Sequence, residues 1–385
     1  MMILALFALQ AASVVSPSAP SDNGDDTIVV TATRLKDTRE AWEACLAKGC
    51  PPDKEMRAGI AYANALFLNG DFPTARQTLS QAQRRNDRYA KTYPTLVSDL
   101  ARANARVSSF DGQPIFAMDQ TLQAVSTLKQ GLASQDAIVM MQRLETGDQM
   151  ARAGRMEAAS SIYLKVARAA ERHGLGAVRG HALFRDAVLI SAAASVNPDY
   201  RVRARRAVAK IAADRDPAMA PFRDGLTQLS ARIALLEDKH SDPAAAAKFS
   251  RVRSPDAVAL LYEPLFDYQR SGLTDSTAMG NSAEWADVAF WVRPDGRVDD
   301  VEVRLTSDNK PGAWLPLKLK LVAQRRYTPF DAAPDSPGLY RVERYAMVHD
   351  MVMPTGTHAY IRSRTPRLET MDLSSTYRGK SVAVN

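Results

Sequence analysis

The chain has 385 residues, 46% of them hydrophobic, so it exceeds a typical single domain and is excluded from the disordered class over most of its length. Its formal net charge is +7, but the 50 basic residues are spread along the whole chain among 43 acidic ones. The densest basic cluster would fan around a helix without aromatic neighbours, which indicates a solvated surface rather than a patch for an anionic partner. It comprises Arg201, Arg203, Arg205 and Arg206. No nucleic-acid partner is expected.

Residues 1–15 form an apolar run that is too short to span a bilayer and is followed by a stretch rich in Ser and Pro. This pattern predicts a signal peptide cleaved after Ala11 or Ala12, and therefore an exported protein. No Lys or Arg precedes the run, which leaves open a misplaced start codon or an uncleaved N-terminus that anchors the chain at the inner membrane.

Residues 16–40 have the composition of a disordered linker, with one β-branched segment at residues 25–34. A β-branched run in a tether cannot bury itself in a core of its own, so it is suited to adding as a strand to an exposed sheet edge. The string DDTIVVTATR resembles the TonB box, by which outer-membrane receptors pair with TonB. The resemblance implies partner-binding residues at Ile28, Val29, Val30 and Thr31. The alternatives are a plain linker or a first strand.

The chain has two cysteines, Cys45 and Cys50, five positions apart. No His lies near them in the sequence, so a metal site is disfavoured. In an exported protein a disulfide that closes this short loop is the preferred interpretation, and two free thiols are the alternative.

Residues 41–253 carry a helical pattern with break signals about 42 residues apart. The signals fall at Gly70-Asp71, Gly112, Gly154, Asn197-Pro198 and residues 238–243. A fixed period of this size predicts about five stacked helical hairpins with a concave binding face. The units that contain Phe72, Ala75 and Leu79, and later Ala159 and Tyr163, resemble tetratricopeptide repeats. We therefore expect an α-solenoid that is tetratricopeptide-like, with degenerate units.

After a connector at residues 254–282, residues 283–365 predict a small sheet domain, so the whole chain is assigned to the α+β class. Val288, Phe290 and Val292 alternate along one strand, and the next strand alternates in the same way. Between the two strands, Asp295-Gly296 supplies the positive φ of a tight hairpin. A short helix and a strand at residues 339–349 follow, and residues 366–385 are predicted to form a frayed tail.

The order strand, strand, helix, strand resembles the TonB C-terminal domain, a partner-binding module. The resemblance implies that an extended peptide adds to an edge strand at residues 339–349, with Tyr340, Val342 and Arg344 as partner-binding residues. It also assigns a structural role to Tyr327, Pro329 and Phe330, which would lock the helix onto the sheet.

The sequence contains no motif of a known catalytic or nucleotide-binding site, and no catalytic residue, metal or cofactor is expected. The preferred function is therefore a non-enzymatic interaction or scaffold protein of the periplasm. Its partners would be envelope proteins such as TonB-system components or outer-membrane receptors, or a second copy of the chain. The alternative is a periplasmic enzyme or enzyme accessory whose repeats recruit substrate.

Overall fold

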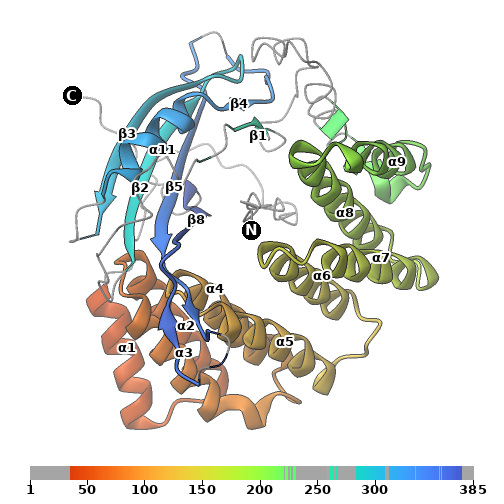
Figure 1. Ribbon diagram of the computed structural model, residues 1–385. Helices are drawn as coiled ribbons and strands as arrows, with labels where there is room; N and C mark the ends of the chain where they lie inside the picture. Colours follow the sequence, from red (N-terminus) through yellow and green to blue (C-terminus); the bar gives the residue numbers. More distant parts are fainter. Residues whose placement is uncertain are drawn as a thin grey trace.

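The computed structural model describes residues 35–220, 222–223, 226, 229–230, 258, 260–263, 266 and 283–374, the last range without 308–311, 334, 355 and 357. Helices α1 to α9 come first, and an antiparallel sheet with helix α11 on one face follows (Figure 1). The α+β assignment is therefore confirmed. Residues 1–34 lie outside the described residues, and with them the predicted signal peptide and the segment at residues 25–34.

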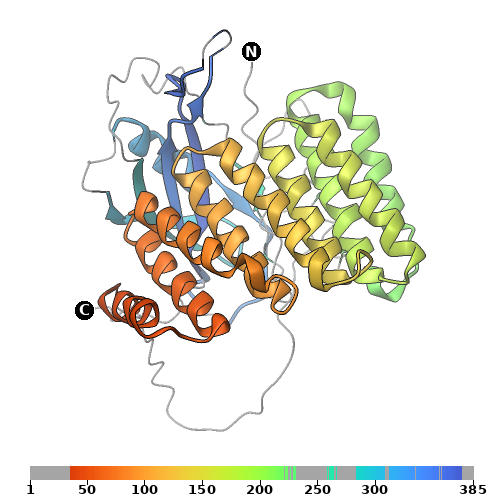
Figure 2. The ribbon, with the colours of Figure 1, turned by 90° about the horizontal axis from the view of Figure 1, so that it is seen from below.

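The helical region consists of consecutive helices that pack side by side (Figure 2). Its helices are α1 (Leu35–Lys48), α2 (Pro52–Leu68), α3 (Phe72–Asn86), α4 (Pro94–Phe110), α5 (Pro114–Gly131), α6 (Ala137–Arg152), α7 (Met156–Arg172), α8 (Gly176–Val196) and α9 (Arg201–Ala212). The expected start at residue 41 is wrong, because α1 already begins at Leu35. That side chain packs against the core formed with Trp42, and the contact orders the last six residues of the expected linker.

The predicted helix breaks coincide with the observed turns. Gly70, Gly112 and Gly154 have φ values of +82°, +71° and +73° and lie between α2 and α3, α4 and α5, and α6 and α7, respectively. Glycine ends a helix in this way because it adopts the left-handed conformation without a Cβ clash. Asn197-Pro198 separates α8 from α9, and the fifth signal, at residues 238–243, lies outside the described residues.

The main sheet has four antiparallel strands in the order β3-β2-β5-β8. They are β2 (Glu284–Val292), β3 (Val298–Thr306), β5 (Leu339–Val348) and β8 (Arg367–Asp372), with α11 (Trp314–Ala323) between β3 and β5 in the chain. The expected hairpin turn is present, with Gly296 at φ +84°. The expected frayed tail is wrong for residues 367–372. These six residues form β8, because β5 offers them a strand edge to pair with.

Two short pairs of strands complete the described structure. β1 (Leu260–Tyr262) pairs with β4 (Arg326–Tyr327), and β6 (Met351–Val352) pairs with β7 (Ile361–Arg362). The second pair forms a hairpin between β5 and β8.

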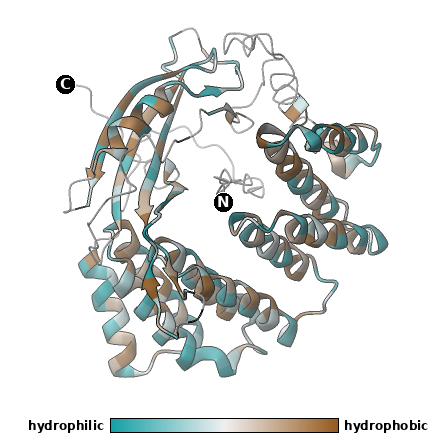
Figure 3. Ribbon diagram, viewed as in Figure 1, coloured by the Kyte–Doolittle hydropathy of each residue, from teal (hydrophilic) through white to brown (hydrophobic). Residues whose placement is uncertain are grey.

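Apolar side chains form three large clusters, and each helix carries both hydrophobic and hydrophilic residues along its length (Figure 3). One cluster joins α6 to α9, and another joins α11 to the sheet. The third contains residues of α1 to α4 together with Trp285, Ala346 and Val348 of the sheet. The helical region and the sheet therefore share a core, although the sequence suggests separate domains.

Candidate interaction surface

The predicted edge strand is an interior strand, so the placement of the binding residues on it is wrong. β5 pairs with β2 along its length on one side, and its residues 343–348 pair with β8 on the other. Val342 is fully buried, and Arg344 lies inside the junction between the sheet and the helices. Tyr340 is half-buried and contacts Trp291. Val342 and Arg344 are therefore structural, and a partner strand cannot pair with the part of β5 that β8 already occupies.

Arg344 is the centre of the junction between the sheet and the helices. Its Nε and Nη2 donate to the two carboxylate oxygens of Asp287 at 2.6 and 2.8 Å. Nη1 and Nη2 also donate to the carbonyls of Phe67 and Leu68, the last residues of α2, at 2.6 and 2.7 Å. Carbonyls at a helix C-terminus have no partner within the helix, so a buried cation satisfies both their hydrogen bonds and their partial negative charge.

The helix turns at this junction approach the sheet very closely. A Cβ at Gly70 would lie 2.2 Å from Nε1 of Trp285, and one at Gly112 would lie 2.5 Å from the carbonyl oxygen of His349. Arg367 of β8 donates to the carbonyl of Ser109 near the end of α4 at 2.7 Å. The turns after α2 and α4 are thus the docking site of the sheet as well as connections between helices.

Strand β3 is the exposed edge of the sheet. Among the described residues it pairs only with β2, and its register with β2 shifts twice. Asp300, beside one of the shifts, has a φ of +49°. Val303 and Leu305 are 38% and 48% exposed, whereas the neighbouring β2 is buried on both faces. Of the two outer strands of the main sheet, β3 is the longer and presents apolar side chains to solvent.

A buried ionic cluster lies between α11 and the face of the sheet that α11 covers. Lys318 Nζ donates to Glu263 at 2.5 Å, and Arg325 donates to Glu263 at 2.7 Å and to Glu343 at 2.8 Å. Burial lowers the pKa of Lys318, and the charge of Glu263 opposes that shift. Burial would raise the pKa of Glu263, but the charges of Lys318 and Arg325 outweigh it and lower this pKa.

The members of this cluster satisfy one another. Tyr345 donates to Glu343, and burial raises the pKa of Tyr345 well above its usual value. The carboxylates already hold cations and hydrogen bonds, so the arrangement is suited to fastening the segment that carries β1 onto α11. The sequence alone does not predict this ionic cluster, because charged residues on a short helix and just after it are usually solvated.

Tyr327 and Phe330 are buried in the same apolar cluster as residues of α11, which confirms their structural role.

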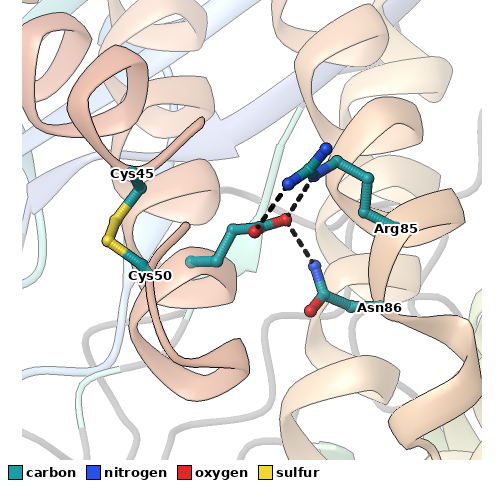
Figure 4. The surroundings of a disulfide bond; sticks show 5 residues. Cys45, Cys50, Arg85 and Asn86 are labelled. Atoms are coloured by element: carbon teal, nitrogen blue, oxygen red, sulfur yellow. Dashed lines mark hydrogen bonds and ion pairs between the residues drawn. A yellow bond between two sulfur atoms is a disulfide. The ribbon is translucent and has the colours of Figure 1, made fainter. Parts of the chain in front are cut away.

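The predicted disulfide is present between Cys45 in α1 and Cys50 before α2 (Figure 4). Beside it, Glu55 in the first turn of α2 accepts hydrogen bonds from Arg85 at 2.7 and 3.1 Å and from Asn86 at 3.0 Å. The hydrogen bond from Arg85 lowers the pKa of Glu55 more than burial raises it. The surroundings of the cysteines therefore tie together the first three helices.

Comparison with known proteins finds no relative: no protein-family model, no curated protein and no solved structure matches the chain. Within the part of the chain that the structure describes, no helix is both long and apolar enough to cross a membrane. The same residues bring together no group of three or more His, Cys, Asp or Glu side chains that would hold a metal ion.

Proposed function

We propose that the protein is a non-enzymatic scaffold of the cell envelope whose sheet binds an extended peptide of a partner at β3. The observation that carries the proposal is the exposed edge position of β3, with Val303 and Leu305 in solvent. An edge strand offers main-chain donors and acceptors to an added strand, and exposed apolar side chains along it contact alternate residues of that strand. This site replaces β5 as the peptide-binding strand.

The features of β3 also limit how long the added strand is. Register shifts interrupt the regular ladder, and the strand carries Asp299, Glu302 and Arg304. Charges and bulges on an edge strand hinder pairing along its whole length. A short, β-branched peptide with flanking charges therefore fits β3 better than a long apolar strand does.

The segment at residues 25–34 has the composition of such a peptide, with Ile28, Val29, Val30 and Thr31 at its centre. Its resemblance to the TonB box and the predicted signal peptide favour the periplasm as the location, with an N-terminal anchor at the inner membrane as the alternative. The donor strand comes from an envelope protein with a similar segment or from a second copy of this chain.

The helical region is a second surface in this proposal. The helices follow one another in pairs, and the turns within three of these pairs carry a glycine with a positive φ. Both features support a tetratricopeptide-like solenoid, whose stacked hairpins present a concave face to a peptide. The sheet and the solenoid are held together by Arg344, so partners bound at the two surfaces are kept in a fixed relation.

The test is binding of a labelled synthetic peptide with the sequence of residues 25–34 to the purified chain lacking residues 1–34, followed by fluorescence anisotropy. A peptide with Val30→Pro is the control, because proline lacks the main-chain donor that a strand needs. We expect the Val303→Lys/Leu305→Lys variant to weaken binding at least tenfold, and Ile115→Lys on α5, with a similarly exposed side chain, to leave it unchanged.

Equal binding of the two peptides, or equal binding by the β3 variant and the parent chain, would refute strand addition at β3.

A further inference from the structure

An ion pair joins α4 directly to α6, although α5 lies between them in the chain. Arg102 Nε and Nη2 donate to the two carboxylate oxygens of Glu145 at 3.0 and 2.6 Å. Arg102 Nη1 donates to Asp99 at 3.0 Å, and Gln142 donates to Glu145 at 3.1 Å. Both carboxylates on this surface are therefore already paired with the same arginine.

Two further arginines lie on the same surface. Asp99, Arg102 and Arg106 recur at intervals of three and four residues, so they share one face of α4. Arg152 follows Glu145 by two helical turns and shares its face of α6. The side chains of Arg106 and Arg152 are exposed. Within the described part of the chain, neither of these two side chains forms an ion pair or a hydrogen bond.

The arginines on this surface repel one another. Burial is the largest cause of the lowered pKa of Arg106, and the positive charge of Arg102 is the second. The charge of Glu145 opposes this shift, and the charge of Arg152 adds to it. The guanidinium of Arg106 is thus partly withdrawn from bulk water, although its side chain is still reachable from solvent. An anion bound beside it would offset this repulsion.

Position within the helix explains one of the two unpaired arginines but not the other. Arg152 is in the last turn of α6, where a cation complements the partial negative charge of the helix C-terminus. Arg106 precedes the last turn of α4. Farther along α4, the carbonyl of Ser109 accepts a hydrogen bond from Arg367 of β8 at 2.7 Å. A ligand of Arg106 would therefore lie near the place where the sheet docks onto the helices.

We propose that Arg106 and Arg152 bind an acidic segment of a partner protein across α4 and α6. This inference rests on the helical surface of the proposed function and names the chemistry of its partner. The planar guanidinium of arginine matches the two oxygens of a carboxylate. Gln149, half-buried on the same face of α6 as Arg152, adds a side-chain amide that can bond the main chain of an extended peptide.

A nucleic acid fits this surface less well than an acidic peptide does. Helix α6 contains no aromatic residue, and the one aromatic residue of α4, Phe110, is buried. Neither helix therefore offers an exposed ring on which a base could stack.

The test is binding of a fluorescein-labelled hexaglutamate peptide to the purified chain, followed by fluorescence anisotropy, with hexaglutamine as the uncharged control. We expect saturable binding of hexaglutamate alone. The variant Arg106→Gln/Arg152→Gln should bind it about tenfold more weakly, because hydrogen bonds to charged groups are lost. The matched control is Arg206→Gln/Lys210→Gln, which removes the same charge from exposed positions on α9 and should bind like the parent chain.

An equal loss in the α9 control, or full binding by Arg106→Gln/Arg152→Gln, would overturn the proposal. So would the absence of hexaglutamate binding to the parent chain. A higher affinity for inorganic phosphate than for hexaglutamate would assign the arginines to a small anion and contradict a protein segment.

Thermal unfolding separates binding from a structural role. Arg106→Gln removes the repulsion between Arg106 and Arg102, so its thermal midpoint should equal or exceed that of the parent chain. A lower midpoint would show that Arg106 stabilises the fold and would overturn its assignment to a ligand.

The same assay separates this inference from strand addition at β3. Loss of hexaglutamate binding in Arg106→Gln/Arg152→Gln, with unchanged binding of the peptide of residues 25–34, would support two distinct sites. If the parent chain binds the peptide of residues 25–34 but not hexaglutamate, only this inference is refuted. If it binds hexaglutamate through Arg106 and Arg152 but not the peptide of residues 25–34, only the β3 site is refuted.

Discussion

Helices α1 to α4 and helices α6 to α9 are built in the same way, from helices joined by short turns, but they differ in what they pack against. Helices α1 to α4 share their core with Trp285, Ala346 and Val348 of the sheet, whereas α6 to α9 form a core of their own. The turn glycines differ accordingly, because Gly70 is pressed against the sheet and Gly154 has no atom within 4 Å of an added Cβ. Both glycines thus end a helix, but only Gly70 also lies where the sheet docks onto the helices.

Helix α5 lies between these two cores and belongs to neither of the large clusters. Several of the side chains buried in α5 and α6 are polar, including Gln120, Thr121 and Gln142. Polar contacts of this kind contribute less than apolar burial to the cohesion of the two halves. The cooperative units are therefore expected to be α1 to α4 with the sheet, and α6 to α9.

The largest effect is expected from Arg344→Ala, which breaks the junction between α2 and the sheet. The substitution leaves Asp287 buried without its cation and should lower the free energy of unfolding by about 3–5 kcal/mol. The control is Arg102→Ala, which removes a half-exposed pair with Glu145 and should cost about 0–1 kcal/mol. Urea denaturation of both variants measures the two losses of unfolding free energy. Equal losses would contradict the role of Arg344 in holding the sheet to α2.

The next effect is expected from glycine substitutions in equivalent turns. Gly70→Ala must displace the Trp285 ring and adopt a positive φ, so we expect a loss of about 2–4 kcal/mol. Gly154→Ala meets open space and carries only the backbone strain, about 1 kcal/mol. Thermal unfolding of the two variants checks the comparison. A similar loss in both would show that the close approach of Trp285 does not matter.

A smaller effect is expected from removing the disulfide with Cys45→Ser/Cys50→Ser. The bond closes a short loop, so its loss should lower the free energy of unfolding by about 2 kcal/mol. The change should appear in α1 to α4 and the sheet, which share the core that contains Trp42. Proteolysis that begins in α6 to α9 of this variant would contradict the assignment of the two units.

The smallest effect depends on pH and concerns Glu55. Its pKa is lowered in the folded protein, so its contribution to stability is present above the ordinary glutamate value of 4.5 and is lost as the pH falls through the folded pKa. We expect Glu55→Gln to cost about 1 kcal/mol at pH 7 and progressively less below about pH 4.5. Unfolding measured from pH 7 to pH 3 tests this sign, and a constant difference would refute it.

The sequence predicted the features that depend on local backbone geometry. Gly296 marks the hairpin turn, Gly70 and Gly112 mark helix ends, and the cysteine spacing marks the disulfide, because each is decided within a few residues. The predicted binding residues at 28–31 lie outside the described residues and stay a prediction.

The features that the sequence did not predict depend on contacts between distant segments. β8 gave no periodic signal because all six of its residues are half-buried, and its pairing is supplied by β5. Arg344 looked like a solvent-facing residue of an edge strand, because alternation along a strand does not reveal that helices cover its second face. Trp285 and Trp291 on that face of β2 were the available signal, since two tryptophans seldom face solvent.

Hydrogen exchange of the parent chain and Arg344→Ala, followed by mass spectrometry, tests the shared core most directly. A shared core predicts faster exchange in peptides of α1 to α4 and of β2 and β5 together, with the exchange of α6 to α9 unchanged. Faster exchange in the sheet alone, with α1 to α4 as protected as in the parent chain, would contradict it and restore a sheet domain separate from the helices.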